Sequence, residues 1–357
     1  MILSVRELLD ALGDPKATET FSAALGEPLL AVEVADGASA AGLAAIVDPS
    51  RSAVDLRALP CAVVLSVPDP AVFTGSGHVP LLLGDVLLTE DPDAPRPYVT
   101  PDDGIAGGLA ALTAVADAAP IAAASLALLL RGAEGPDVPV GLAAESAAYS
   151  ALQSGSEFTR WRSRRPAKPA DADPQRVHVE RVGDVLRVTL ARPRRRNAID
   201  AAMRDALADA FSVAVADPDL TVELRGDGPD FCAGGDLDEF GSRPDPALGH
   251  LIRLTRSPAR LLHSVAARTT AYLHGACLGG GIELPAFAGR VVAAPDASTG
   301  LPEVGLGLIP GAGGTVSLPR RIGRQRTAWI GLSGRRVDAL LALEWGLVDA
   351  VEDTPPT

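Results

Sequence analysis

The clearest pattern of apolar and polar residues lies in the second half of the chain. The two residue types alternate through VHVERVGDVLRVTLAR on both sides of Gly183-Asp184, which predicts a β-hairpin. Apolar residues then recur at every fourth position from Met203 to Val215, which predicts a helix over Asp200–Ala216. Asp200 is placed to cap the start of that helix.

After this helix, strand and helix patterns alternate to the end of the chain. Short apolar segments predict strands at Leu220–Leu224, Thr269–Leu273 and Val291–Ala293. Helical patterns follow at Gly279–Ala288, Arg324–Leu332 and Val337–Glu344. Strands that alternate with helices in this way are typical of a layered α/β fold.

The first half has a less regular pattern. Strands are predicted at Leu29–Val34, Cys61–Val67 and Val86–Thr89, and two helices at Ile105–Arg131 and Val140–Arg160. The apolar run Ala118–Leu130 is shorter than the roughly 20 residues that cross a bilayer, so it favours a buried helix and no membrane contact.

A change in composition separates the two halves. Residues 164–176 (RRPAKPADADPQR) are rich in Pro, Ala and Asp and have no apolar periodicity, which predicts a linker. We therefore expect an N-terminal extension over 1–165, a linker over 166–175 and a core over 176–357.

Charge and cysteine content narrow the class of protein. The net charge is −13, of which residues 1–175 carry −12 and the remainder −1, and this balance argues against nucleic acid as a partner. Cys61, Cys232 and Cys277 are odd in number and lack metal-binding spacing. The start of the chain does not resemble a signal peptide. This feature and the cysteine pattern together favour free thiols in the cytoplasm.

Four short motifs in the second half are candidates for chemistry. A small-residue loop spans Cys232–Leu237, glycine-rich segments open helices at Gly279–Leu284 and Ile309–Thr315, and Glu303 follows Leu301-Pro302. Glycines at a helix start let a ligand approach free N–H groups, and two such donors can hold a developing oxyanion. Two carboxylates with different pKa values can divide acid and base roles. Each motif alone is weak, because turns and tight packing also need glycine, so their joint order carries the inference.

Taken in order, these motifs resemble the crotonase (enoyl-CoA hydratase/isomerase) superfamily. The matching segments are RPRRRNAID, FCAGGDL, HGACLGGGIELPAFA, GLPEVGLGLIPGAGGTVSLPRRIGR and GLSGRRVDALLALEWGLVDAV, from about Arg176 to Val351. The resemblance is to an actinobacterial-type member with an N-terminal extension. It implies an α/β fold with a ββα spiral core, an acyl-CoA substrate, neither a metal nor a redox cofactor, and a homo-oligomer, either trimer or hexamer.

The resemblance also assigns roles to particular residues. Gly235 and Gly280 would supply the two oxyanion-hole N–H groups, and Gly311 would help to place the catalytic water. Glu283 and Glu303 would be the catalytic pair, and the presence of both favours the addition of water across the 2,3 double bond of a 2-enoyl-CoA. Glu283 would activate the water and Glu303 would protonate Cα, or the two would share these roles.

A second set of residues is implied to contact coenzyme A, in the loop after the first strand and in the small-residue loop. Guanidinium groups suit phosphates, although any one of these arginines can equally belong to a solvated basic loop. The implied set is Arg192, Arg194, Arg196, Ala198 and Ala233. Outside this set, His274 is expected to be a packing residue, and Asp236 and Asp238 are expected to cap a following helix.

The main departure from the superfamily is the early end of the core. Relatives usually continue beyond the segment that matches Gly346-Leu347-Val348 with helices that complete the substrate pocket. Residues 109–165 resemble that helical segment, so we expect Gly104–Arg165 to dock on the core in its place, within one chain or exchanged with a neighbour. An independent helical domain is the alternative. Because LLLGDVLLTEDPDA resembles AFAGRVVAAPDAST, the first half also resembles a worn and catalytically inactive copy of the core.

Two further readings of the function stay open. One keeps the fold and changes the reaction to that of an isomerase, a hydrolase, a C–C-cleaving enzyme or a cofactor-independent arylacetyl-CoA dioxygenase. The other is a non-catalytic assembly subunit, against which the intact glutamates and oxyanion glycines argue.

Overall fold

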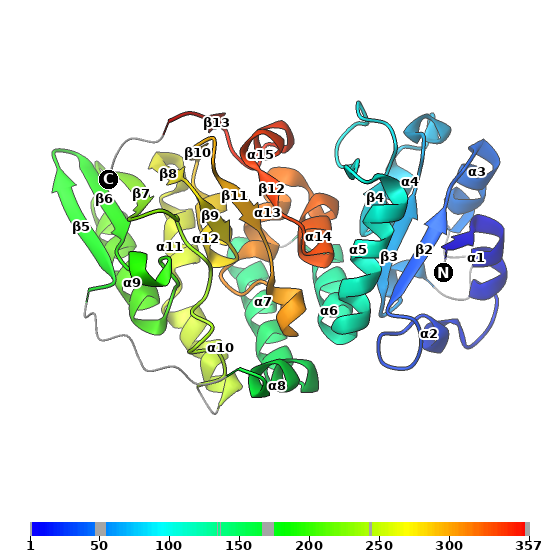
Figure 1. The fold of residues 1–357 in the computed structure, drawn as a ribbon, viewed down its shortest axis with the longest axis horizontal. Helices are drawn as coiled ribbons and strands as arrows, with labels where there is room; N and C mark the ends of the chain where they lie inside the picture. Colours follow the sequence, from blue (N-terminus) through cyan, green and yellow to red (C-terminus); the bar gives the residue numbers. More distant parts are fainter. Residues whose placement is uncertain are drawn as a thin grey trace. The chain divides into compact units, whose positions relative to one another are not determined.

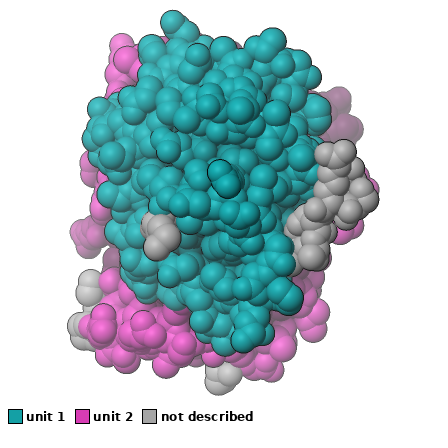
Figure 2. Space-filling view, turned by 90° about the vertical axis from the view of Figure 1, so that its right-hand side faces the viewer, with its two compact units in different colours: residues 1–135, 322–334 teal, residues 136–321, 335–357 magenta. Residues whose placement is uncertain are grey.

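The computed structural model describes residues 2–46, 55–133, 135, 137–165, 175–242 and 245–353. They divide into two compact units, coloured separately in Figure 2. Unit 1 comprises Met1–Gly135 and Ile322–Gly334, and unit 2 comprises Pro136–Arg321 and Arg335–Thr357. This division differs from the expected one, because residues 137–165 belong with the core and 322–334 do not. Most of the expected linker, residues 166–174, lies outside the described residues.

Unit 1 is built on a four-stranded parallel sheet (Figure 1). Its strands lie in chain order: β1 (Ile2–Ser4), β2 (Leu29–Glu33), β3 (Ala62–Ser66) and β4 (Val86–Leu88). All residues of β3 and β4 are buried, as expected for parallel strands covered on both faces. The predicted strands β2, β3 and β4 are confirmed, whereas the short β1 had no recognisable pattern.

The helices of unit 1 include one segment from late in the chain. They are α1 (Val5–Leu12), α2 (Ala17–Thr20), α3 (Gly37–Ile46), α4 (His78–Leu83), α5 (Gly104–Ala118), α6 (Pro120–Arg131) and α14 (Arg324–Ser333). Helix α14 packs against α5 and α6. Buried Asp85 links these elements, because it forms ion pairs with Arg131 of α6 at 2.6 Å and Arg324 of α14 at 3.3 Å.

The single helix predicted over Ile105–Arg131 is wrong, because the chain bends by 113° between α5 and α6. Pro120 follows the bend, and a proline both lacks an N–H donor and disfavours helical geometry at the preceding residue. Among the described residues no single helix is long and apolar enough to cross a membrane, and only α5 and α6 taken together pass that test.

Unit 2 contains two sheets. The larger has the strand order β13-β10-β8-β7-β6-β5, in which only the β5–β6 hairpin is antiparallel. Its strands are β5 (Val177–Val182), β6 (Val185–Leu190), β7 (Thr221–Gly226), β8 (Thr269–Leu273), β10 (Arg290–Ala293) and β13 (Ala350–Val351). The smaller sheet consists of β9 (Ala276–Leu278), β11 (Ser298–Gly300) and β12 (Val337–Asp338). The predicted hairpin and the layered α/β fold class are confirmed.

The helices of unit 2 come from both halves of the chain. They are α7 (Val138–Gln153), α8 (Ser156–Ser163), α9 (Ala201–Ala216), α10 (Pro246–Thr255), α11 (Pro258–Ser264), α12 (Gly280–Glu283), α13 (Gly314–Ile322) and α15 (Ala339–Trp345). Asp200 caps α9 as expected, since its side chain accepts a hydrogen bond from Met203 N at 2.8 Å. The helix predicted over Gly279–Ala288 is shorter, because Pro285 changes the backbone to a 3-10 turn over Pro285–Phe287.

Helices α7 and α8 bear on the docking hypothesis. Helix α7 lies beside α10 (Figure 1) and contacts both α10 and α11. Helices α7 and α8 therefore pack on the core of the same chain, as the docking hypothesis expects. Helices α5 and α6, in contrast, belong to unit 1. The proposed origin of the first half as a worn copy stays a prediction.

Candidate active site

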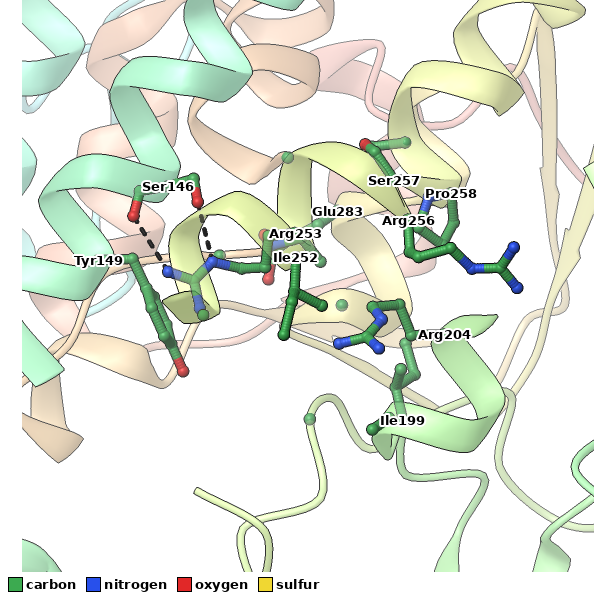
Figure 3. A pocket seen from close by; sticks show the side chains of 18 of the residues that line it. Ser146, Tyr149, Ile199, Arg204, Ile252, Arg253, Arg256, Ser257, Pro258 and Glu283 are labelled. Carbon is green, nitrogen blue, oxygen red and sulfur yellow. Dashed lines mark hydrogen bonds between the residues drawn. The ribbon is translucent and has the colours of Figure 1, made fainter. Parts of the chain in front are cut away.

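The candidate motifs meet at one cavity of about 530 Å³ in unit 2 (Figure 3). Its lining includes five residues singled out from the sequence: Gly235, Gly280, Glu283, Glu303 and Gly311. Helix α7 adds a wall, as expected if residues 104–165 dock on the core, although the four motifs themselves did not indicate it. The site therefore combines residues from both halves of the chain.

The two glycines present backbone donors to this cavity. Cys232 N donates to Ala276 O at 3.0 Å, and Leu278 N donates to Cys232 O at 2.9 Å, so the Gly235 loop lies along β9, which leads to Gly280. Neither Gly235 N–H nor Gly280 N–H donates to another described residue. The intervening Gly279 has φ +50°, which favours glycine. Two unused donors in one cavity suit an oxyanion.

Glu283 is the best-supported carboxylate of the site. It is 2% exposed on α12, and its Oε2 accepts hydrogen bonds from Ala312 N at 2.7 Å and Gly314 N at 2.9 Å. Burial raises the pKa of Glu283 to about 7, against the lowering effect of backbone hydrogen bonds from Ala312, Gly314 and Gly311. These donors favour the charged form, so Glu283 can hold a negative charge near neutral pH.

Glu303 lies in a different environment. Its Oε2 is buried and has no hydrogen-bond partner among the described residues. Burial, and next the charge of Glu283, raise the pKa of Glu303 well above its usual value. Glu303 therefore stays protonated at a pH where Glu283 is ionised. The difference between the two environments assigns opposite protonation states to the pair.

A third buried carboxyl, Glu145 of α7, completes the group. Its Oε1 accepts from Gly313 N at 2.7 Å, and its Oε2 accepts from Thr315 N at 2.9 Å and from Thr315 Oγ1 at 2.7 Å. Burial, together with Glu283, raises the pKa of Glu145 to about 8. Amides 312 and 314 thus bind Glu283 while amides 313 and 315 bind Glu145, so one turn holds two carboxyls.

Sequence reasoning missed Glu145. The only signal was an acid inside an otherwise apolar helix, with Leu142 and Tyr149 close to it on the same helical face. Both neighbours line the cavity. A lone acid of this kind is rarely buried without partners, but the sequence could not show which backbone groups would supply them.

The residues expected to contact coenzyme A do not line this cavity, and that contact stays a prediction. None of Arg192, Arg194, Arg196, Ala198 and Ala233 lines the cavity. Arg192 is 3% exposed, and its guanidinium pairs with Asp236 at 3.0 Å and Asp200 at 3.3 Å. A guanidinium buried between two carboxylates has a structural role, and contact of Arg192 with coenzyme A stays a prediction.

The remaining members of that set have simpler environments. Arg196 pairs with Asp230 at 2.6 Å, Arg194 is exposed, and Ala198 O accepts a hydrogen bond from Arg192. Ala233 N donates to Arg196 O at 2.9 Å, so this loop is tied to the arginine-rich one.

Three other expectations can be compared with the structure. His274 contacts Phe231 edge-on, and its Nε2 lies 2.9 Å from Gly228 O, which agrees with a packing role. Asp236 and Asp238 do not cap a helix, because a turn follows them. Asp236 pairs instead with Arg192, and Asp238 pairs with Arg195 at 2.9 Å.

Free amide donors beside buried carboxyls define a site suited to carbonyl chemistry, and comparisons with known proteins agree with this. The enoyl-CoA hydratase/isomerase family model matches residues 180–354. A Bacillus subtilis protein named as an enoyl-CoA hydratase/isomerase is 39% identical over 166 residues, which are 46% of this chain and 64% of that protein. The cyclohexa-1,5-dienecarbonyl-CoA hydratase of Thauera aromatica is 36% identical over 185 residues, covering 52% of this chain and 70% of that enzyme.

A solved structure, the enoyl-CoA hydratase from Thermoplasma volcanium, is 37% identical, with a TM-score of 0.47 over 50% of this chain and 72% of that one. The chain belongs to the enoyl-CoA hydratase/isomerase family, within the crotonase superfamily. It spans less than two thirds of the length of some curated relatives, 64% of the Bacillus subtilis protein and 56% of one from Arabidopsis thaliana.

The position of Glu145 leads to a test by hydrogen exchange. Glu145→Ala leaves the buried amides of Gly313 and Thr315 without an acceptor, a loss of about 1–3 kcal/mol for each unsatisfied group. We expect faster amide exchange across residues 311–315 by mass spectrometry. The control is Gln153→Ala, on the same helix and cavity wall, where the side chain has no hydrogen bond with a described residue. Equal exchange in the two variants would contradict the role of Glu145 in holding the turn.

Proposed function

We propose that this protein adds water across the 2,3 double bond of a 2-enoyl-CoA. The observation that supports this most directly is the presence of Glu283 and Glu303 in one cavity with opposite preferred protonation states. Hydration needs a base to take a proton from water and an acid to deliver one to carbon. A single base that moves a proton within the substrate is enough for an isomerase, so the pair favours hydration.

The first step is activation of the thioester. Its carbonyl oxygen accepts hydrogen bonds from the N–H groups of Gly235 and Gly280, which stabilise the negative charge that develops on that oxygen. Electron density moves from the double bond toward the carbonyl, and Cβ becomes electrophilic. Because both donors belong to the backbone and have no competing partner among the described residues, they need no rearrangement to act.

The second step forms one C–O and one C–H bond. Ionised Glu283 takes a proton from water while the water oxygen bonds to Cβ, and protonated Glu303 delivers its proton to Cα. Glu283 then carries a proton and Glu303 a negative charge, so a net proton transfer from Glu283 to Glu303, through solvent, restores the starting state. Gly311 supports the base by its hydrogen bond to Glu283.

Replacing either glutamate tests this assignment. Glu283→Gln and Glu303→Gln each remove one proton-transfer group while keeping its size, so each should lower kcat by about 10²- to 10⁴-fold. The assay follows loss of the enoyl thioester of crotonyl-CoA by its ultraviolet absorbance. Glu239→Gln is the control, since this acid lies at the rim of the same cavity but is exposed. Full activity of either active-site variant would remove that residue from the mechanism.

The proposed protonation states also predict the pH profile. Activity should rise with pH as Glu283, with its pKa near 7, loses its proton and becomes a base. Activity should fall at higher pH as Glu303 loses the proton that it must deliver. In the residual activity of Glu303→Gln the alkaline fall should be absent, because an amide has no proton to lose there. A profile that falls with pH through the pKa of Glu283 would contradict its role as the base.

A further inference from the structure

One arginine in the cavity wall has no carboxylate partner among the residues that the structure describes. Arg253, on α10, lines the cavity and stacks over the ring of Tyr149, with its guanidinium carbon 4.7 Å from the ring centroid. Its Nε donates to Ser146 Oγ at 2.9 Å, and its Nη2 donates to Ser146 O at 3.1 Å and to Ser150 Oγ. Figure 3 shows this guanidinium beside Tyr149, with two hydrogen bonds to Ser146 dashed. The group is held in a fixed orientation by neutral acceptors.

The neighbouring arginines of the cavity wall, in contrast, pair with carboxylates. Arg256 pairs with Asp209 at 2.8 Å and points away from Glu283 in Figure 3, and Arg204 pairs with Asp205 at 2.8 Å. Within the described residues, no Asp or Glu oxygen lies within 4.0 Å of the Arg253 guanidinium, and its Nη1 makes no hydrogen bond. A partly buried cation without a counter-charge is costly, so its presence in a ligand cavity points to an anion supplied by the ligand.

Two features support a ligand anion at this wall. The side chain of Arg204 also lines the cavity, and although it pairs with Asp205, its charge acts unfavourably on Arg253. Glu145, the acid that acts on Arg253, has a pKa raised to about 8 and is largely neutral at pH 7. The described part of the chain therefore leaves the charge of Arg253 largely uncompensated at neutral pH.

The position of Arg253 identifies which part of the substrate carries the anion. The Tyr149 ring that Arg253 covers also contacts Gly311, where a Cβ atom would come within 2.6 Å of the ring. Arg253 is therefore one aromatic ring away from the turn that holds Glu283. In an acyl-CoA the long pantetheine arm separates the thioester from the phosphates. An anion this close to the reacting carbons belongs to the acyl group.

We propose that Arg253, assisted by Arg204, binds a carboxylate at the far end of the acyl group, so that the substrate class is a carboxyacyl-CoA. This inference rests on the proposed hydration. It adds a specificity-determining group, because an uncharged acyl chain would leave the guanidinium without a counter-charge in the cavity. A planar guanidinium with its Nη1 edge unused can bind a carboxylate through charge-assisted hydrogen bonds.

The test compares pairs of 2-enoyl-CoA esters of five to eight carbons, one ending in a methyl group and the other in a carboxylate. For the wild-type protein we expect kcat/KM to be about 10- to 100-fold higher for the carboxylate at one or more chain lengths, the usual range for a hydrogen bond to a charged group. Arg253→Gln should abolish this preference, so that the carboxylate and methyl esters of one length react at similar rates. Arg253→Lys should retain part of it, and the control Arg256→Gln should retain all of it.

A binding measurement that does not depend on turnover separates the possible failures. Calorimetry with the saturated pair glutaryl-CoA and pentanoyl-CoA should show tighter binding of glutaryl-CoA to the wild-type protein. If the methyl-ended and carboxylate-ended esters of every chain length have equal kcat/KM, and the saturated pair binds equally tightly, the inference is overturned. The proposed function would still stand. Tighter glutaryl-CoA binding without hydration of any ester would overturn the proposed function alone.

Acyl-pantetheine esters lack the CoA phosphates. They therefore show whether the anion that Arg253 binds lies on the acyl group or on CoA. Persistence of the carboxylate preference in these esters is the expected result. Loss of the preference, with Arg253→Gln weakening every CoA ester equally, would assign the anion to a CoA phosphate and overturn the inference. If Arg253→Gln fails to fold because it loses its contacts with Ser146 and Ser150, the wild-type comparison and Arg253→Lys still decide the outcome.

Discussion

The backbone of residues 311–315 holds two carboxyl groups at once, and the geometry of the whole site depends on that arrangement. Amides 312 and 314 donate to Glu283, and amides 313 and 315 donate to Glu145. The amides of a turn normally face several directions, and here they are divided between two buried acids. Three carboxyls share one desolvated cavity, so the number of charges is limited by mutual repulsion and burial. Glu283, whose pKa is raised least of the three, is the group best able to carry a charge.

This arrangement also explains why the site needs residues from both halves of the chain. The glycines, Glu283 and Glu303 come from the segment that matches the family model, whereas Glu145, Tyr149 and Leu142 come from α7. Without α7, the amides of Gly313 and Thr315 would lose their acceptor, and one wall of the cavity would be open. The helix is therefore part of the site itself. It also supplies Ser146 and Ser150, which orient Arg253 on α10.

The sequence was sufficient for the parts of the site that depend on local chemistry. The glycine-rich loops and their neighbouring acids marked four candidate motifs, and the resemblance of those motifs to the crotonase superfamily singled out Gly235, Gly280, Glu283, Glu303 and Gly311, all of which line the cavity. Alternating patterns likewise located the β5–β6 hairpin and the parallel strands β2, β3 and β4. Contacts between distant segments were not predictable, because the pairing of Glu145 with Gly313 spans 168 residues. The burial of Arg192 was not predictable for the same reason, since its partner Asp236 is distant in sequence and only the fold buries both. Pro120 is a local signal for the break between α5 and α6. The apolar pattern continues across it and suggests a single helix.

The most direct test of hydration follows the mass of the product. A 2-enoyl-CoA incubated with the full-length protein in water enriched in ¹⁸O should yield a 3-hydroxyacyl-CoA that gains one water, with the heavy oxygen on Cβ and the thioester intact. That result requires both a base acting on water and an acid acting on Cα, as proposed for Glu283 and Glu303. A product of unchanged mass with a shifted double bond, or release of free CoA, would contradict the account.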